Sequence, residues 1–106
     1  MLRDRRYGFG QPRATGFERL VVPGTEAVGF QQLPPPASIG HAIIHVTEAA
    51  IRWRADSDPT LTLGIRLETD SYWDMMEYDL DWGDLFRQIR FISLGSQSVL
   101  EAQFFD

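Results

Sequence analysis

The chain has 106 residues, a formal net charge of −5 at pH 7 and no cysteine. This length fits one small domain, and the lack of cysteine excludes a disulfide framework, thiolate catalysis and any metal site built on thiolates. Hydrophobic residues make up 43% of the chain and aromatic residues 12%, which is enough to form a core. No apolar run approaches the ~20 residues of a membrane span and no secretory signal is visible, so we expect a soluble protein made in the cytoplasm.

All ten basic residues are arginine, and the charges are unevenly distributed. Residues 1–19 carry five arginines and two acids, whereas residues 68–84 carry seven acids and no arginine. The planar guanidinium group suits ordered pairing with carboxylates and aromatic faces. A basic segment and an acidic belt in one chain favour two interpretations equally. Either the basic segment lies on another copy or on an acidic partner, or the two are solvated surfaces of opposite sign.

The N-terminal part is predicted to be an extended arm over residues 1–16, followed by one domain over residues 17–106. The arm contains Gly8, Gly10 and Pro12 and shows neither a helical nor a strand period.

A first group of strand signals precedes a proline-rich segment. Residues 17–22 and 26–30 are predicted as short strands joined by a turn. Residues 33–36 contain three consecutive prolines, which restricts them to a stiff linker or a sheet edge.

The strongest strand signals lie in the middle of the chain. Residues 41–47 place apolar side chains at every second position, and residues 50–54 alternate with Trp53 between two arginines. The pattern predicts that Trp53 is buried, and the short join at residues 48–49 predicts a hairpin between the two strands. The Asp-Ser-Asp-Pro run at residues 56–59 ends the second strand, because proline cannot donate to a ladder and aspartate and serine favour turns.

The second half of the chain continues the strand pattern. Residues 61–67 alternate strictly, and residues 72–78 are rich in aromatic residues and methionine. Asp84 is expected to cap a single helical turn over residues 85–87. The last predicted strands are residues 86–94 and 98–105. Six to eight short strands separated by turn signals predict an all-β fold, a small antiparallel β-sandwich or jelly-roll-like domain.

The sequence offers little candidate chemistry. His41 and His45 on one strand would have Cα atoms roughly 13 Å apart, too far for one zinc ion. Residues 79–84 carry oxygen donors like those of a calcium loop, but the segment lacks the glycine at the sixth position and the glutamate at the twelfth position that such a loop requires. Carboxylate pairs such as Asp74 and Glu77 have no nucleophile motif beside them. We therefore predict a non-enzymatic protein with no catalytic residue, metal ion or cofactor.

The tryptophans supply the main alternative function. Trp73 and Trp82 lie among acidic residues, an arrangement that suits stacking on sugar rings while carboxylates bind hydroxyl groups, and that equally suits anchoring a protein interface. We expect no nucleic-acid binding, because the net charge is negative and no sheet face interleaves basic with aromatic residues.

Four segments carry a resemblance to a known group of proteins: residues 25–30 (TEAVGF), 41–54 (HAIIHVTEAAIRWR), 58–64 (DPTLTLG) and 89–92 (IRFI). In their sequence and order, these segments resemble segments of small virion-associated proteins encoded by tailed bacteriophages. The similarity covers residues 25–105 and leaves the arm outside it. Residues 56–58 lack the turn glycine of that group, and residues 68–84 are longer and more acidic than its corresponding link.

The resemblance implies a β-sandwich protein of the assembled virion, acting as capsid decoration, cement or head–tail accessory. Its partners would be capsid, portal or tail subunits and further copies of itself as a homo-oligomer. A domain this small buries only about two thirds of the surface of its unfolded chain, so neighbouring subunits would add useful contacts. The residues predicted to make these contacts are Arg3, Arg5, Arg6, Tyr7 and Phe9 in the arm, and Trp73, Tyr78 and Trp82 on a second surface.

Overall fold

Two antiparallel sheets pack face to face in the computed structural model, which describes residues 13–75 and 82–106. The four-stranded sheet has the order β1-β7-β2-β5 and the three-stranded sheet has the order β4-β3-β6. This arrangement confirms the predicted all-β sandwich. The strands are β1 (Ala14–Pro23), β2 (His41–Thr47), β3 (Ile51–Arg54), β4 (Ile65–Leu67), β5 (Tyr72–Met75), β6 (Arg90–Ser93) and β7 (Gln97–Phe105).

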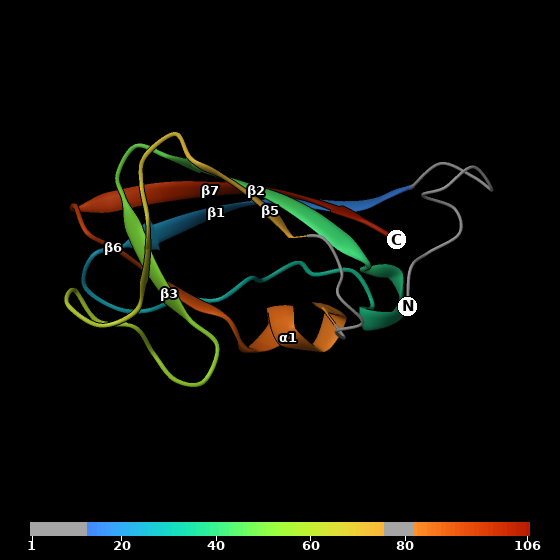
Figure 1. Cartoon of the computed structure of the whole chain (residues 1–106), viewed down its shortest axis with the longest axis horizontal. Coiled ribbons are helices and arrows are strands. Elements are labelled where there is room, and N and C mark those ends of the chain that lie inside the picture. The colour runs from blue at the N-terminus through green and yellow to red at the C-terminus, as the bar shows by residue number, and fades with distance from the viewer. Residues whose placement is uncertain (1–12, 76–81) are drawn as a thin grey trace.

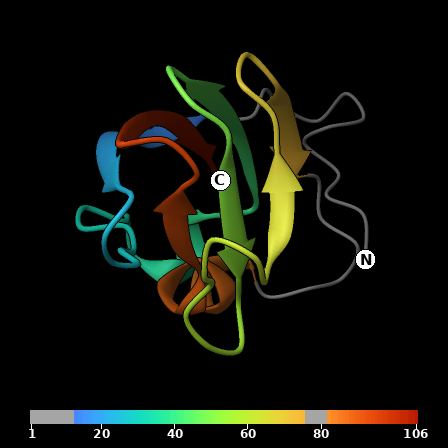
Figure 2. The same cartoon turned by 90° about the vertical axis from the view of Figure 1, so that its left-hand side faces the viewer.

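A short helix completes the second layer of the sandwich. Figure 1 shows α1 (Trp82–Gln88) on the same side of the four-stranded sheet as β3 and β6, where the three-stranded sheet ends. A single turn of 3-10 helix, η2 (Pro36–Ser38), follows the proline run and contacts α1. In Figure 2, β3 lies between β6 and β4, and β4 is the outer strand of its sheet.

The alternating pattern of β2 is confirmed. Ala42, Ile44 and Val46 are fully buried, while the residues between them are partly exposed. Both edges of β2 are occupied, because β2 pairs with β7 on one side and with β5 on the other. The strand is therefore central in the four-stranded sheet.

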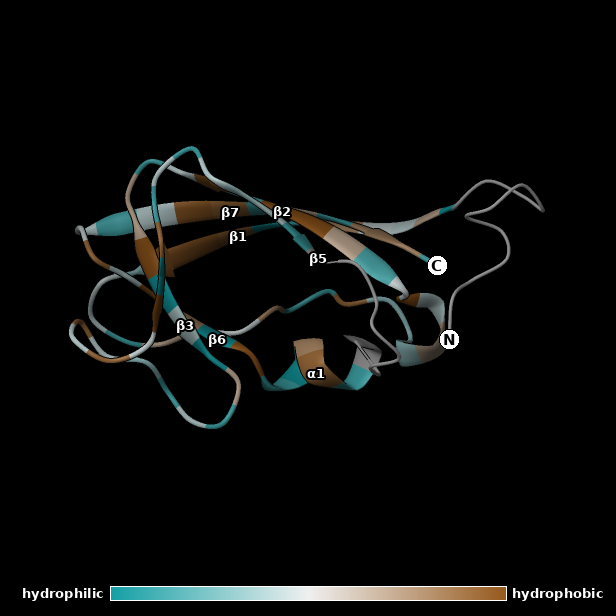
Figure 3. Ribbon diagram, viewed as in Figure 1, coloured by the Kyte–Doolittle hydropathy of each residue, from teal (hydrophilic) through white to brown (hydrophobic). Residues whose placement is uncertain are grey.

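β1 is longer than the predicted strand over residues 17–22. Ala14 and Gly16 pair with Phe105 and Phe104 of β7, so the sheet begins inside the segment predicted as arm. Arg13 pairs with Asp106, and two of its guanidinium nitrogens donate to the same carboxylate oxygen at 2.7 and 3.2 Å. Figure 3 shows the hydrophobic stretches of β1 and β7 side by side.

Aromatic side chains fill the space between the layers. The ring of Phe30 meets the rings of Phe86, Phe91 and Phe104 edge to face, with centroids 5.2 to 6.1 Å apart. Edge-to-face contacts are a favoured geometry for aromatic pairs. Phe86 comes from α1, Phe91 from β6 and Phe104 from β7, so one aromatic cluster joins the helix to both sheets.

The predicted hairpin between residues 41–47 and 50–54 is wrong. β2 belongs to the four-stranded sheet and β3 to the three-stranded sheet, so the join between them is a corner that crosses the sandwich. Glu48 has a φ of 73°, which turns the chain at this corner. The buried Ser98 hydroxyl lies within hydrogen-bonding distance of the carbonyl oxygens of Thr47 and Ala49 and holds the corner in place.

Three further predicted strands are shorter than expected. Residues 26–30 contribute only an isolated bridge between Val28 and Phe91. Residues 61–64 form a bend, and strand structure begins at Ile65. Within residues 86–94 the first three residues belong to α1, because a short apolar run does not by itself distinguish a buried strand from a buried helix.

Candidate functional site

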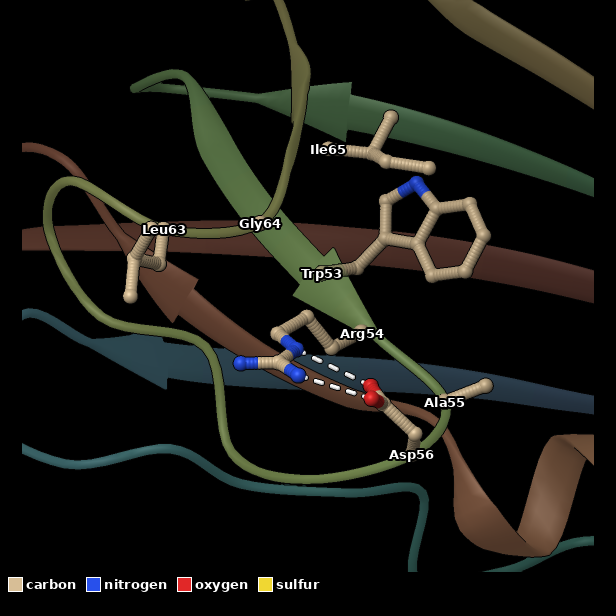
Figure 4. Close-up of a pocket in the computed structure, with 7 residues that line it drawn as sticks. All are labelled: Trp53, Arg54, Ala55, Asp56, Leu63, Gly64 and Ile65. Atoms are coloured by element: carbon tan, nitrogen blue, oxygen red, sulfur yellow. Dashed lines mark hydrogen bonds and ion pairs between the residues drawn. The ribbon is translucent and has the colours of Figure 1, made fainter.

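A groove of about 410 Å³ lies along the β3–β4 side of the sandwich. Figure 4 shows the side chains of Trp53 and Arg54 leaving β3 in opposite directions, with Ile65 beside the Trp53 ring and Leu63 on the other side of the strand. The lining residues are Trp53, Arg54, Ala55, Asp56, Leu63, Gly64 and Ile65.

Apolar side chains next to this groove are unusually exposed. Leu61, Leu63 and Ile65 expose 54%, 59% and 57% of their surfaces. Single exposed apolar side chains are normal on a protein surface, but three within five residues of one segment make that segment a candidate interaction site. We call these three residues the apolar ridge. The ridge makes this side of the sandwich the best candidate for binding another molecule.

The backbone of the ridge is held by the protein itself. Arg52 donates hydrogen bonds to the carbonyl oxygens of Leu61 and Gly64, at 3.2 and 2.8 Å. The hydroxyl of Thr60 accepts from the amide of Leu63 at 3.0 Å, and the Thr60 amide donates to the Leu63 carbonyl at 2.9 Å. Because the loop is already ordered, binding a partner here loses little additional conformational entropy.

Gly64 is required where the ridge enters β4. Its φ is +134°, and a Cβ atom at this position would lie 3.1 Å from Arg52 Cβ, Pro59 Cβ and the carbonyl oxygen of Trp53. A side chain would therefore be strained both by the backbone conformation and by its neighbours.

Two tryptophans join the sheets beneath the groove. The rings of Trp53 on β3 and Trp73 on β5 are stacked, with centroids 4.5 Å apart and an interplanar angle of 27°. Both are partly buried against the core, so the expected burial of Trp53 is only partial. Among the described residues, Trp53 Nε1 is the buried side-chain polar atom that has no hydrogen-bond partner.

Paired charges lie on the three-stranded sheet and the loops beside it. The bidentate hydrogen bond between Arg54 and Asp56 lowers the pKa of Asp56 and raises the pKa of Arg54. The hydrogen bond from Arg66 likewise lowers the pKa of Glu68 and raises that of Arg66. The ion-paired residues are three arginines and three acids, Arg54 with Asp56, Arg66 with Glu68, and Arg90 with Asp58. These pairs contribute no net charge.

The two histidines lie apart on the outer face of the four-stranded sheet. His41 stacks on Phe105, and its Nε2 is 2.7 Å from a carboxylate oxygen of Asp74. His45 stacks on Tyr72, with centroids 4.3 Å apart. In the part of the chain that the structure describes, no group of three or more potential ligands is placed to hold a metal ion.

Few of the residues predicted as contacts fall within the described ranges. Trp73 lies on β5 with one ring face against Trp53, and Trp82 is the first residue of α1. Of the acidic belt, Glu68, Asp70 and Asp74 are exposed on β5 and the turn before it. The predicted contacts outside the described residues are Arg3, Arg5, Arg6, Tyr7, Phe9 and Tyr78.

The apolar ridge could not be predicted from the sequence pattern of residues 61–67. Its strict alternation predicts a strand with one buried face, whereas residues 61–64 form a bend, strand structure begins only at Ile65, and all three side chains are exposed. Thr60 and Gly64, which bracket the segment, are the local signals that favour a turn. The hydrogen bonds from Arg52 are a long-range feature that spacing alone does not reveal.

The fold defines the chain as a small β-sandwich protein. No protein-family model, curated protein or solved structure matches the chain. Across residues 13–75 and 82–106, none of the helices has the length and hydropathy required to cross a membrane.

Proposed function

We propose that the chain is a non-enzymatic structural component of a bacteriophage virion, a capsid decoration or cement protein or a head–tail accessory. The observation that carries this proposal is the apolar ridge of Leu61, Leu63 and Ile65, which is exposed yet held rigid by Arg52. A preordered apolar surface binds other protein surfaces at low entropic cost. Subunits of a particle bind their neighbours in this way.

The segments that resemble phage virion proteins also support the proposal. They form the Val28–Phe91 bridge, the β2–β3 corner, the loop before β4, and β6. These segments form the β2–β3 corner and most of the apolar ridge, so the resemblance includes the residues around the candidate surface. In a symmetric particle each contact repeats, and many weak contacts together retain the subunit.

Static light scattering of the full chain beside a variant lacking residues 1–12 tests assembly. The deletion stops before Arg13 because Arg13 pairs with Asp106. We expect the full chain to form a closed oligomer and the shortened chain to form a smaller species. A 12.1 kDa monomer in both cases would argue against self-assembly and against a role of the arm in holding two subunits together.

A carbohydrate- or receptor-binding module of a phage tail is the alternative function. Tyr72 favours it, because the residue is 69% exposed with one ring face stacked on His45, and the carboxylates of Asp70 and Asp74 lie nearby on the same strand and turn. An exposed aromatic ring beside carboxylates suits a sugar. Glycan-array binding that is lost in Tyr72→Ala, with an unchanged melting temperature, would support this alternative over the virion proposal.

A further inference from the structure

An indole N–H group beside the groove has no hydrogen-bond acceptor. Among the described residues, Trp53 Nε1 is the buried side-chain polar atom without a partner. Buried polar groups in native proteins are almost always hydrogen-bonded, because an unpaired buried donor loses its contacts with water and gains no other contact in their place. Trp53 also lines the groove of about 410 Å³. The unpaired donor therefore lies next to a space that a ligand can occupy.

The orientation of the Trp53 ring is fixed by its neighbours. The ring is stacked on that of Trp73, with centroids 4.5 Å apart, and the strand register places Ile65 of β4 opposite Trp53 of β3. Figure 4 shows the Nε1 edge of the ring turned toward Ile65. The direction of the N–H bond is therefore set before any ligand binds, which lowers the entropic cost of binding.

Access to this donor depends on Ile65. The Ile65 side chain lies beside the Nε1 edge and is 57% exposed, and exposed side chains change rotamer rapidly. A rotamer change of Ile65 gives a molecule in the groove a path to Nε1 without movement of either sheet.

The lining of the groove indicates the kind of ligand. Arg54 and Asp56 are paired with each other through two hydrogen bonds, at 2.7 and 2.9 Å, so together they present no net charge. A charged ligand would lose hydration here without meeting an unpaired opposite charge. Small-molecule sites of this volume combine apolar walls with a few polar groups. Apolar walls are supplied here by Ala55, Leu63, Gly64 and Ile65.

We propose that this groove binds a small neutral molecule with an apolar body and a carbonyl-type acceptor, and that the acceptor receives the hydrogen bond of Trp53 Nε1. The apolar body lies against Leu63 and Ile65, and the bound acceptor satisfies the donor that is unpaired in the free protein. This site does not rest on the virion proposal, because it requires neither a second subunit nor residues 1–12.

Nuclear magnetic resonance of the isotope-labelled full chain, titrated with cyclohexanone, tests the site. Cyclohexanone supplies an apolar ring and a carbonyl acceptor. We expect the indole N–H signal of Trp53 to move downfield and to exchange more slowly with water, because the N–H becomes hydrogen-bonded. The matched probe is methylenecyclohexane, in which a methylene group replaces the oxygen. This hydrocarbon should shift signals of the groove without moving the Trp53 N–H signal downfield.

Replacement of Trp53 tests the donor itself. Trp53→Phe keeps an aromatic ring and removes the N–H group, so a bound carbonyl is left without a partner. We expect the affinity for cyclohexanone to fall at least ~tenfold and the affinity for methylenecyclohexane to stay the same. Trp73→Phe retains the Trp53 N–H group, and this matched control should keep the wild-type affinity for both probes. The melting temperature of each variant verifies folding.

Three results would each overturn the proposed site. The first is a Trp53 N–H signal that does not move at any concentration of cyclohexanone. The second is a Trp53→Phe variant that binds cyclohexanone as tightly as the wild type. The third is an equal loss of affinity for both probes in Trp53→Phe, which would show that the ring contributes only apolar contact.

Discussion

The carboxylate of Glu18 accepts a bifurcated hydrogen bond from the main-chain N–H of Gln31, whose nitrogen is 2.7 and 3.0 Å from the two carboxylate oxygens. The same carboxylate accepts a second hydrogen bond from the amide of Gln32 at 2.7 Å, and Glu18 itself is only 4% exposed. A buried carboxylate that binds main-chain donors replaces its hydration shell with fixed partners. Glu18 therefore ties the segment before the proline run to β1.

Replacing this carboxylate with a neutral amide should destabilise the fold. Glu18→Gln keeps the shape but leaves one main-chain donor facing an NH₂ group, so we expect a loss of about 1–3 kcal/mol in the free energy of unfolding. Urea denaturation measures this change. Glu26→Gln, at an exposed position, is the control and should be neutral. Equal stability of the two variants would show that the Glu18 hydrogen bonds add nothing.

The β2–β3 corner should depend on the hydroxyl of Ser98. Ser98→Ala removes a buried hydroxyl that lies within hydrogen-bonding distance of the carbonyl oxygens of Thr47 and Ala49 and accepts from the Ala49 amide, so the corner loses these hydrogen bonds. The expected destabilisation is about 1–3 kcal/mol, measured by thermal or urea unfolding. Ser96→Ala, at an exposed position in the preceding turn, should change stability little. A wild-type stability for Ser98→Ala would contradict this role.

The apolar ridge should lose its rigidity when Arg52 is changed. Arg52→Gln cannot reach both carbonyl oxygens of the loop, so amide hydrogen exchange over residues 60–64 should accelerate while the amides of β7 stay protected. Association of the chain should weaken with it, because the partner must then order the loop. Arg19→Gln, on an exposed position of β1, is the matched control. Unchanged exchange in the loop would refute the rigid-ridge interpretation.

Trp73 should act first as a packing residue. Trp73→Ala removes a ring that stacks on Trp53 and contacts the core, and we expect a destabilisation of about 2–4 kcal/mol. Trp73→Phe keeps an aromatic ring and should retain most of the stability. Tryptophan fluorescence followed through urea unfolding measures both. A Trp73→Ala variant as stable as the wild type would instead favour a role in binding.

Acid should weaken the ion pairs around the groove. The hydrogen bonds from Arg54 and Arg66 lower the pKa of Asp56 and Glu68 in the folded protein. A carboxyl with a lowered folded pKa stabilises the fold above its unfolded pKa, and this contribution disappears as the pH falls below about 4 through the folded value. Asp56→Asn should reduce the acid-dependent part of the stability curve, and high salt should reduce it too because the pair is exposed. An acid transition identical in wild type and Asp56→Asn would contradict this.

Periodicity predicted the strands that lie in the middle of a sheet. β2, and β7 from Leu100 onward, alternate between buried and half-exposed residues, so their period of two is directly visible in the sequence. The β2–β3 corner was not predictable, because it depends on Ser98, which is 49 residues from Ala49. The ridge was not predictable either, since residues 61–65 have the alternation of a strand but residues 61–64 are held in a bend by Thr60 and Arg52.

Mass spectrometry of purified virions, from a tailed phage whose genome carries this sequence, tests the proposed function most directly. We predict that the full chain is present in a fixed ratio to the major shell or tail subunits, and that particles supplied with Ile65→Lys carry fewer copies. A wild-type chain that is made in infected cells but absent from purified particles would contradict its function as a virion component.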